Sequence, residues 1–139
     1  MAVRPYAVAL ERLKAVGLRP TRQRLALARL LFEAGDRHVT AEQLHGETQA
    51  ANVRLSLATV YNALHQFTAQ GMLREVVVEP GRSYFDTNTS DHHHFFFEDD
   101  GRLEDIPGNE VEVARMPAPP QGTRLSRIDV IVRVVRNES

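Results

Sequence analysis

Residues 56–71 read SLATVYNALHQFTAQG, and this stretch decides the fold because it marks both ends of one amphipathic helix. Ser56 is a residue type that caps helix N-termini, and Gly71 is the type that adopts the left-handed backbone after a helix. Apolar residues recur at helical spacing and predict one buried face, made of Leu57, Val60, Leu64 and Phe67. The opposite face carries small or polar side chains with little charge, namely Ala58, Thr59, Asn62, His65 and Gln66, with Tyr61 at the boundary.

The residues on either side of this helix predict a winged helix-turn-helix. Three amphipathic helices precede it, over residues 7–16, 22–34 and 41–51, and Thr40 with Gln43 fits a capping box at the start of the third. After Gly71 the period changes to that of a hairpin, with strands over residues 73–78 and 82–86. In this fold the second helix of the pair enters the major groove of DNA, so residues 56–66 are the candidate reading helix. A helical bundle with an appended hairpin and no nucleic-acid ligand is the alternative.

A run of three histidines, His92 to His94, is followed directly by three phenylalanines. If the run opens a strand, His92 and His94 share one face, and His93 lies on the other face with Phe95 and Phe97. Imidazole is the commonest protein metal ligand, and the chain contains no cysteine that could supply a thiolate. The run therefore predicts metal or haem ligation, while a polar surface turn is the alternative.

The rear of the chain predicts a small sheet. Strands over residues 93–98 and 102–106 are joined through Asp99-Asp100-Gly101, a hairpin signal. A short irregular or helical crossing over residues 108–116 follows, and residues 125–135 alternate as one long strand with Ile128, Val130, Val132 and Val134 on one face. Three strands of this size leave apolar area and an edge uncovered, so we expect a second copy to cover them across a two-fold axis.

Composition and charge support an α+β protein with two parts, residues 1–87 and residues 88–139. Residues 1–74 contain ten Lys and Arg and five Asp and Glu. Residues 75–139 contain seven Lys and Arg and thirteen Asp and Glu. A basic front half can face polyanions, and an acidic rear half supplies oxygen ligands for cations. The sequence has neither a bilayer-spanning apolar run nor a signal-peptide pattern, so we expect a cytoplasmic protein with no membrane partner.

Three segments resemble the ferric uptake regulator (Fur) superfamily: residues 17–21 (GLRPT), 38–44 (HVTAEQL) and 57–64 (LATVYNAL). The triple histidine before aromatics, residues 105–108 (DIPG) and residues 126–130 (SRIDV) are most similar to its iron response regulator (Irr) branch. The resemblance implies an N-terminal winged helix-turn-helix with a small C-terminal α/β dimerisation domain. It implies a homodimeric, metal- or haem-responsive transcriptional regulator of iron and haem homeostasis genes. A zinc- or manganese-responsive or peroxide-sensing Fur-family repressor is the alternative.

The resemblance also carries over site residues. A divalent metal (Fe, Mn or Zn) would be held by His38, Asp86, His94 and Asp105. A second metal or haem site would use Asp91, His92, His93 and Glu112, although a further family ligand position there holds Ile128, which cannot ligate. The residues matched to DNA contact are Arg19, Thr59, Tyr61 and Asn62, with Arg22, Arg24 and Arg54 as candidate phosphate partners. The implied partners are double-stranded operator DNA, a second copy of the chain and a haem-supplying protein.

Two other classes of protein fit the sequence less well. A metal-dependent hydrolase could use the histidines with Glu98 or Asp99, but no helix carries a His-Glu-x-x-His pattern and little of the chain remains to form a substrate pocket. A haem or metal storage module would not need the basic front half. The sequence therefore predicts a regulator and not an enzyme.

Overall fold

The computed structural model describes residues 6–138 of the 139-residue chain. The chain divides into two compact units, with the boundary between Thr89 and Ser90. We call them the N-terminal unit and the C-terminal unit and describe each by itself.

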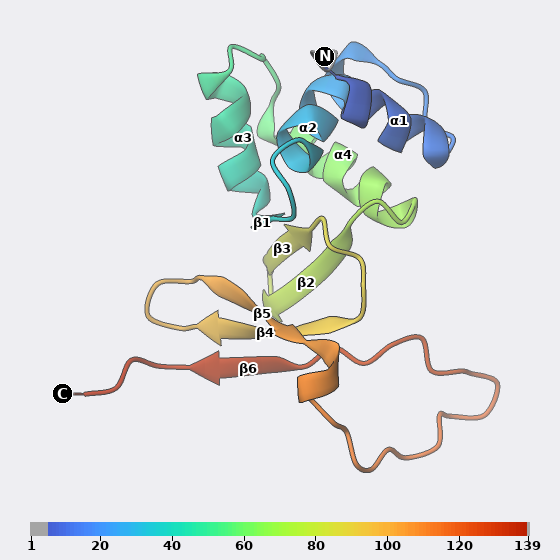
Figure 1. The fold of residues 1–139 in the computed structure, drawn as a ribbon, viewed down its shortest axis with the longest axis vertical. Coiled ribbons are helices and arrows are strands. Elements are labelled where there is room, and N and C mark those ends of the chain that lie inside the picture. Colours follow the sequence, from blue (N-terminus) through green and yellow to red (C-terminus); the bar gives the residue numbers. More distant parts are fainter. Residues whose placement is uncertain (1–5, 139) are drawn as a thin grey trace. The chain divides into compact units, whose positions relative to one another are not determined.

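The N-terminal unit is a winged helix-turn-helix, as predicted (Figure 1). Its elements in order are α1 (Ala7–Ala15), α2 (Arg22–Phe32), β1 (His38–Val39), α3 (Ala41–Ala50), α4 (Leu57–Ala69), β2 (Arg74–Glu79) and β3 (Arg82–Asp86). The three strands form an antiparallel sheet in the order β1-β3-β2. The sequence did not predict β1, because a strand of two residues has no measurable period.

Residues at the helix ends determine where α3 begins and where α4 begins and ends. Thr40 and Gln43 form the complete capping box of α3, with each side chain accepting from the other residue's backbone N–H. The hydroxyl of Ser56 accepts the backbone N–H of Thr59, 3.1 Å away, at the start of α4. Gly71 follows α4 with a φ of 81°, a left-handed conformation that most other residues adopt only at a cost. The caps predicted at both ends of the reading helix are therefore confirmed.

The buried faces of the four helices form one core in this unit. Its largest fully buried apolar side chains lie on the four helices and on β1 and β3 of the small sheet: Leu13, Leu27, Leu31, Leu44, Val60, Leu64, Phe67, Val39 and Phe85. Leu57, which was predicted to be buried, is only half-buried, because it lies in the first turn of α4.

The C-terminal unit is a three-stranded sheet in the order β5-β4-β6. β4 (His92–Phe97) pairs antiparallel with β5 (Leu103–Pro107) and parallel with β6 (Ile131–Val134), while the short 3-10 helix η1 (Gly108–Glu110) follows β5. The expected long strand over residues 125–135 is wrong over its first half. Residues 125–130 alternate in hydropathy, but only the Val130 carbonyl continues the pairing, by accepting the backbone N–H of His94 at 3.2 Å.

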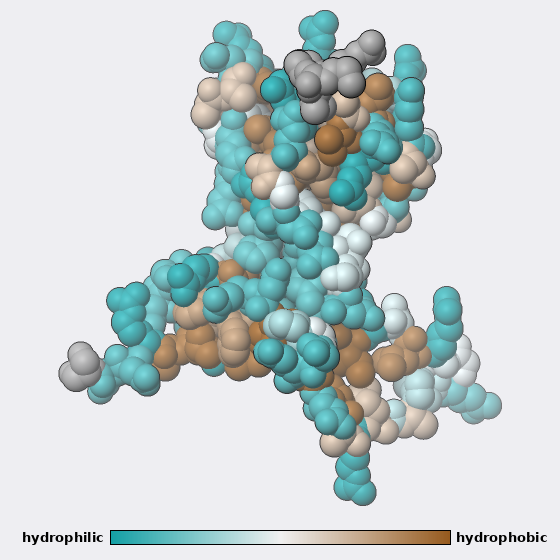
Figure 2. All heavy atoms as spheres, in the orientation of Figure 1, coloured by the Kyte–Doolittle hydropathy of each residue, from teal (hydrophilic) through white to brown (hydrophobic). Residues whose placement is uncertain are grey.

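The C-terminal unit leaves apolar side chains at its surface. Val113, Met116, Leu125, Val132 and Val135 are between 36% and 66% exposed. Figure 2 shows apolar side chains on the outside of this unit near its sheet. Among residues 6–138, no helix combines the length and the apolar character that crossing a bilayer requires.

We expect Thr40→Ala to lower the free energy of unfolding by about 1 kcal/mol, because it removes the acceptor for the N–H of Gln43 at the start of α3. Urea denaturation followed by circular dichroism measures this change. Thr40→Ser is the matched control, since it keeps the hydroxyl and should stay close to the wild type. Equal losses for the alanine and serine variants would show that the methyl group, and not the cap, accounts for the effect.

Candidate metal centre and nucleic-acid interface

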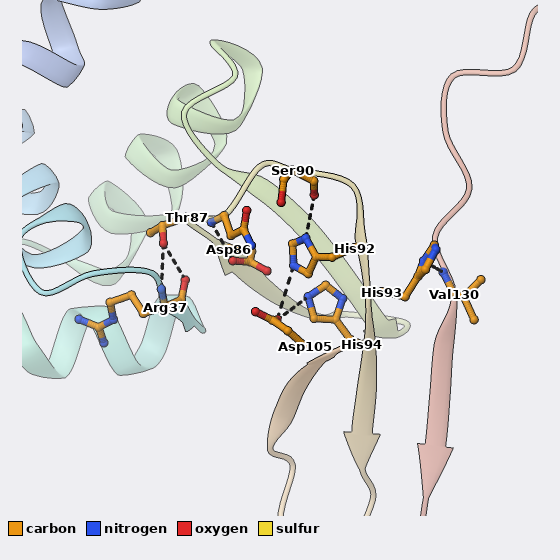
Figure 3. Close-up of polar contacts among 10 residues, drawn as sticks. Arg37, Asp86, Thr87, Ser90, His92, His93, His94, Asp105 and Val130 are labelled. Carbon is orange, nitrogen blue, oxygen red and sulfur yellow. Dashed lines mark hydrogen bonds and ion pairs between the residues drawn. The ribbon is translucent and has the colours of Figure 1, made fainter. Parts of the chain in front are cut away.

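The three histidines of β4 divide between the two faces of the sheet. His92 and His94 are 4% and 2% exposed, and their ring centroids lie 4.6 Å apart. His93 is half-buried, and its Nδ1 accepts the backbone N–H of Val130 at 3.1 Å. Figure 3 shows His93 directed toward Val130 and away from the other two rings. The alternation of a strand thus selects which imidazoles can act together.

Asp105 of β5 faces both His92 and His94. Its Oδ1 lies 3.5 Å from Nε2 of His92 and 3.4 Å from Nε2 of His94 (Figure 3). His94 and Asp105 are direct partners in the antiparallel pairing, so the backbone register brings them together. One donor atom from each of the three residues lies within 4.8 Å of the others. Two buried imidazoles and one carboxylate therefore converge on a small volume.

The protonation of His92 is set by a backbone contact. Its Nδ1 lies 2.7 Å from the carbonyl oxygen of Ser90, and a carbonyl oxygen can only accept, so Nδ1 carries the proton. Nε2, which lies on the side of Asp105, is then the ring nitrogen that can ligate a metal. Metal-ligating histidines commonly donate their other ring N–H to a carbonyl in this way. Two nitrogens and an oxygen, with no thiolate, fit zinc, ferrous iron or manganese.

The N-terminal unit holds a second pair of potential ligands. His38 of β1 is the direct cross-strand partner of Asp86 of β3, and on the other side Asp86 pairs with Arg74 of β2. Asp86 is 1% exposed, and its carboxylate accepts the backbone N–H of Asn88 at 2.9 Å. The His38 ring is half-buried and meets Tyr84 edge-on, with the centroids 6.4 Å apart. The register thus makes an imidazole residue the cross-strand neighbour of a buried carboxylate, and both belong to the donor classes that bind these same metals.

The four residues assigned to a second site do not gather within the described part of the chain. Asp91 and Glu112 are exposed, and His93 lies on the opposite face from His92. The structure brings His92 to His94 and Asp105 instead. The two-residue period of the histidine run, which predicted that His92 and His94 share one face, is confirmed and is the signal that places His92 there.

A close approach fixes the start of β4 near the end of β5. A Cβ added at Gly108 would lie 2.6 Å from the carbonyl oxygen of Asp91, a distance that no side chain tolerates without movement of the backbone. Only glycine therefore fits beside the residue that precedes the histidine run.

The outer face of α4 carries the residues expected to contact DNA. Asn62 is exposed, and Thr59 shares a hydroxyl contact of 2.9 Å with the cap residue Ser56. The hydroxyl of Tyr61 donates to Glu42 of α3 at 2.7 Å; this bond raises the pKa of Tyr61 and lowers that of Glu42. The ring of His65 stacks on Tyr61, with the centroids 6.2 Å apart. Tyr61 is thus held in position before any ligand binds.

Arg24 links the start of α2 to the reading helix. It donates to the carbonyl of Arg19 at 2.9 Å and to the side chain of Gln66 at 3.0 Å. Arg19, Arg22 and Arg54 have exposed side chains that face solvent. Three of the arginines singled out from the sequence are therefore accessible to phosphate, while Arg24 also has a structural role within the unit.

The comparisons with known proteins agree on one family. The model of the ferric uptake regulator family matches residues 15–132. The peroxide operon regulator of Bacillus subtilis is 35% identical over 128 residues, which cover 91% of this chain and 87% of that protein. The ferric uptake regulation protein of Bordetella parapertussis is 36% identical over 80 residues, 58% of each chain. The crystal structure of the Vibrio cholerae ferric uptake regulator superposes with a TM-score of 0.70 at 25% identity, covering 91% of this chain and 98% of that one. The chain belongs to the ferric uptake regulator family.

Proposed function

We propose that this protein is a metal-responsive transcriptional regulator that binds operator DNA through its N-terminal unit. The observation that carries the proposal is the cluster of His92, His94 and Asp105, in which a backbone carbonyl fixes the ring of His92 for ligation through Nε2. A donor set of this kind inside a chain of this family points to metal sensing. Catalysis forms no part of the proposal.

We further propose that His38 and Asp86 bind the same ion as His92, His94 and Asp105. The support is chemical: each unit holds an imidazole paired across strands with a carboxylate, His38 with Asp86 and His94 with Asp105. A shared divalent ion would balance the negative charges of the two carboxylates, Asp86 and Asp105. Ligands from both units would make the orientation of the DNA-binding unit depend on the metal, provided the ion binds the DNA-competent state more tightly.

For the DNA-binding surface we propose the N-terminal half of α4. Tyr61 and Asn62 would meet base edges, Thr59 would lie beside them, and Arg19 would contact the backbone or the minor groove. The basic balance of residues 1–74 supports this choice, since contacts to phosphate dominate the affinity for DNA. We propose a cytoplasmic homodimer, in which the exposed apolar residues of the C-terminal unit meet a second copy.

A second candidate function is a response to peroxide. It is favoured by the similarity to the Bacillus subtilis peroxide operon regulator, which extends over 91% of this chain. The Irr branch, control of iron and haem genes, haem as a ligand and a haem-supplying partner stay predictions from the sequence resemblance. Titration with haem, with metals and with hydrogen peroxide, each read out as DNA affinity, separates these candidates.

We expect His92→Ala and His94→Ala each to weaken binding of Mn²⁺ or Zn²⁺ by at least about 100-fold, since loss of an outer partner of a metal ligand alone costs about 10- to 100-fold. Isothermal titration calorimetry of the chelated full chain measures the affinity. His93→Ala is the matched control within the same run, because its ring faces Val130 and should leave metal affinity unchanged. A larger loss for His93→Ala than for the other two variants would contradict the assignment.

Metal affinity should fall as the pH drops below about 6.5, the ordinary pKa of histidine, because ligation requires unprotonated imidazole nitrogens. Calorimetry at several pH values in buffers of different ionisation enthalpy measures both the affinity and the protons released. An affinity that stays constant from pH 7.5 to about pH 5.5 would indicate that histidines are not ligands.

We expect Tyr61→Ala and Asn62→Ala each to cost about 1–3 kcal/mol in binding free energy and to relax sequence preference. An operator selected from a pool of random duplexes, followed by fluorescence anisotropy with metal-loaded protein, provides the measurement. Arg133→Ala, a charge on β6 of the other unit, is the control and should bind normally. If neither Tyr61→Ala nor Asn62→Ala changes affinity, α4 does not read the bases.

A further inference from the structure

We propose that Arg37 is the positioning residue that transmits metal binding at His38 and Asp86 to the helices of the DNA-binding unit. The inference rests on the proposed metal site and adds the route by which a change there reaches α3. Arg37 directly precedes His38 and is anchored in two ways, through its backbone to the chain leaving β3 and through its guanidinium to two helices.

The backbone of Arg37 is bound to the residue that follows Asp86. The N–H of Arg37 donates to Oγ1 of Thr87 at 2.9 Å, and the carbonyl of Arg37 accepts the N–H of Thr87 at 2.9 Å (Figure 3). The hydroxyl of Thr87 also donates to that carbonyl at 3.1 Å. These bonds extend the pairing of His38 with Asp86 by one residue on each strand. Movement of either ligand therefore moves Arg37.

The guanidinium of Arg37 joins the end of α2 to α3. Nη1 donates to the carbonyl of Leu30 at 3.0 Å and to Oε1 of Glu47 at 2.8 Å, and Nη2 donates to Oε2 of Glu47. Leu30 is among the last four residues of α2, whose carbonyls lack a partner within the helix. The two bonds to Glu47 form a bidentate pair, whose planar geometry fixes direction as well as distance. Both charged side chains are about two-thirds shielded from solvent.

The route continues from α3 to the reading helix. Glu42, in the first turn of α3, accepts a hydrogen bond from the hydroxyl of Tyr61 on α4 at 2.7 Å. A rigid α3 thus has Arg37 bound near one end and a proposed base-contacting residue bound near the other. Hydrogen bonds on either side of α3, together with the helix itself, therefore connect the ligand pair to Tyr61.

The test measures how metal binding changes the hydrogen–deuterium exchange of the full chain. In the wild type we expect Mn²⁺ to slow exchange of the amides of α3 at least about fivefold, the lower end of usual couplings between sites. Arg37→Ala should bind Mn²⁺ within about threefold of the wild type yet lose this protection of α3. Arg37→Lys should also lose it, because an ammonium group cannot replace the planar fork.

Two further variants keep the test decisive. Arg29→Ala removes an arginine from the exposed pair with Glu33 and should behave as the wild type. If Arg37→Ala does not fold, Glu47→Gln takes its place, since it keeps the shape of the partner and removes its charge; we expect it to bind Mn²⁺ normally and to show reduced protection of α3.

The possible failures are distinguishable. Absence of Mn²⁺ and Zn²⁺ binding in the wild type would overturn the proposed metal centre, and the inference with it. Normal Mn²⁺ binding together with full protection of α3 in Arg37→Ala, or in Glu47→Gln where that variant replaces it, would overturn the inference alone. Loss of Mn²⁺ affinity in Arg37→Ala in parallel with loss of protection would reduce Arg37 to a support for the ligands and would likewise overturn it.

Discussion

The pairing of β1 with β3 is the constraint on which the arrangement of the N-terminal unit depends. It consists of only two residue pairs, His38 with Asp86 and Val39 with Phe85, yet each pair has a separate role. The first sets an imidazole beside a buried carboxylate. The second places two fully buried apolar side chains under the helices, where Phe85 also meets the ring of His65 on α4 at 5.6 Å. Because neighbouring residues in a strand face opposite sides, one short ladder serves both the proposed ligand pair and the core.

The parts of the fold that depend on local chemistry could be predicted from the sequence. The caps at Thr40 and Ser56, the glycine after α4 and the two hairpins are each determined by residues a few positions apart. Parts that depend on distant partners could not. β1 exists only because β3 lies beside it, and residues 125–130 lack a neighbouring strand over most of their length despite their alternation. Alternation indicates two unlike faces, but a strand also requires a partner for its backbone groups.

The candidate site divides in the same way. Resemblance to a family supplied four ligand positions, and the structure pairs them as His38 with Asp86 and His94 with Asp105. What the sequence could not supply was the proton on Nδ1 of His92, since this depends on a carbonyl two residues away whose direction is a property of the folded backbone. The contacts of Arg37 could not be predicted from the sequence either. Thr87 lies 50 residues further along the chain, and Glu47 lies 10 residues further along, in α3.

Gly108 affects the register in which β4, with its three histidines, pairs with β5. Side chains in a strand alternate, so a shift of β4 by one residue against β5 would turn His93 toward Asp105 and would turn His92 and His94 away. Such a slipped pairing would offer one imidazole where the native register offers two. The near contact between Gly108 and the carbonyl of Asp91 leaves no room for a side chain at that position. A larger residue there would displace the start of β4 from the end of β5, and the two buried imidazoles could lose their common carboxylate while every histidine remained in the sequence.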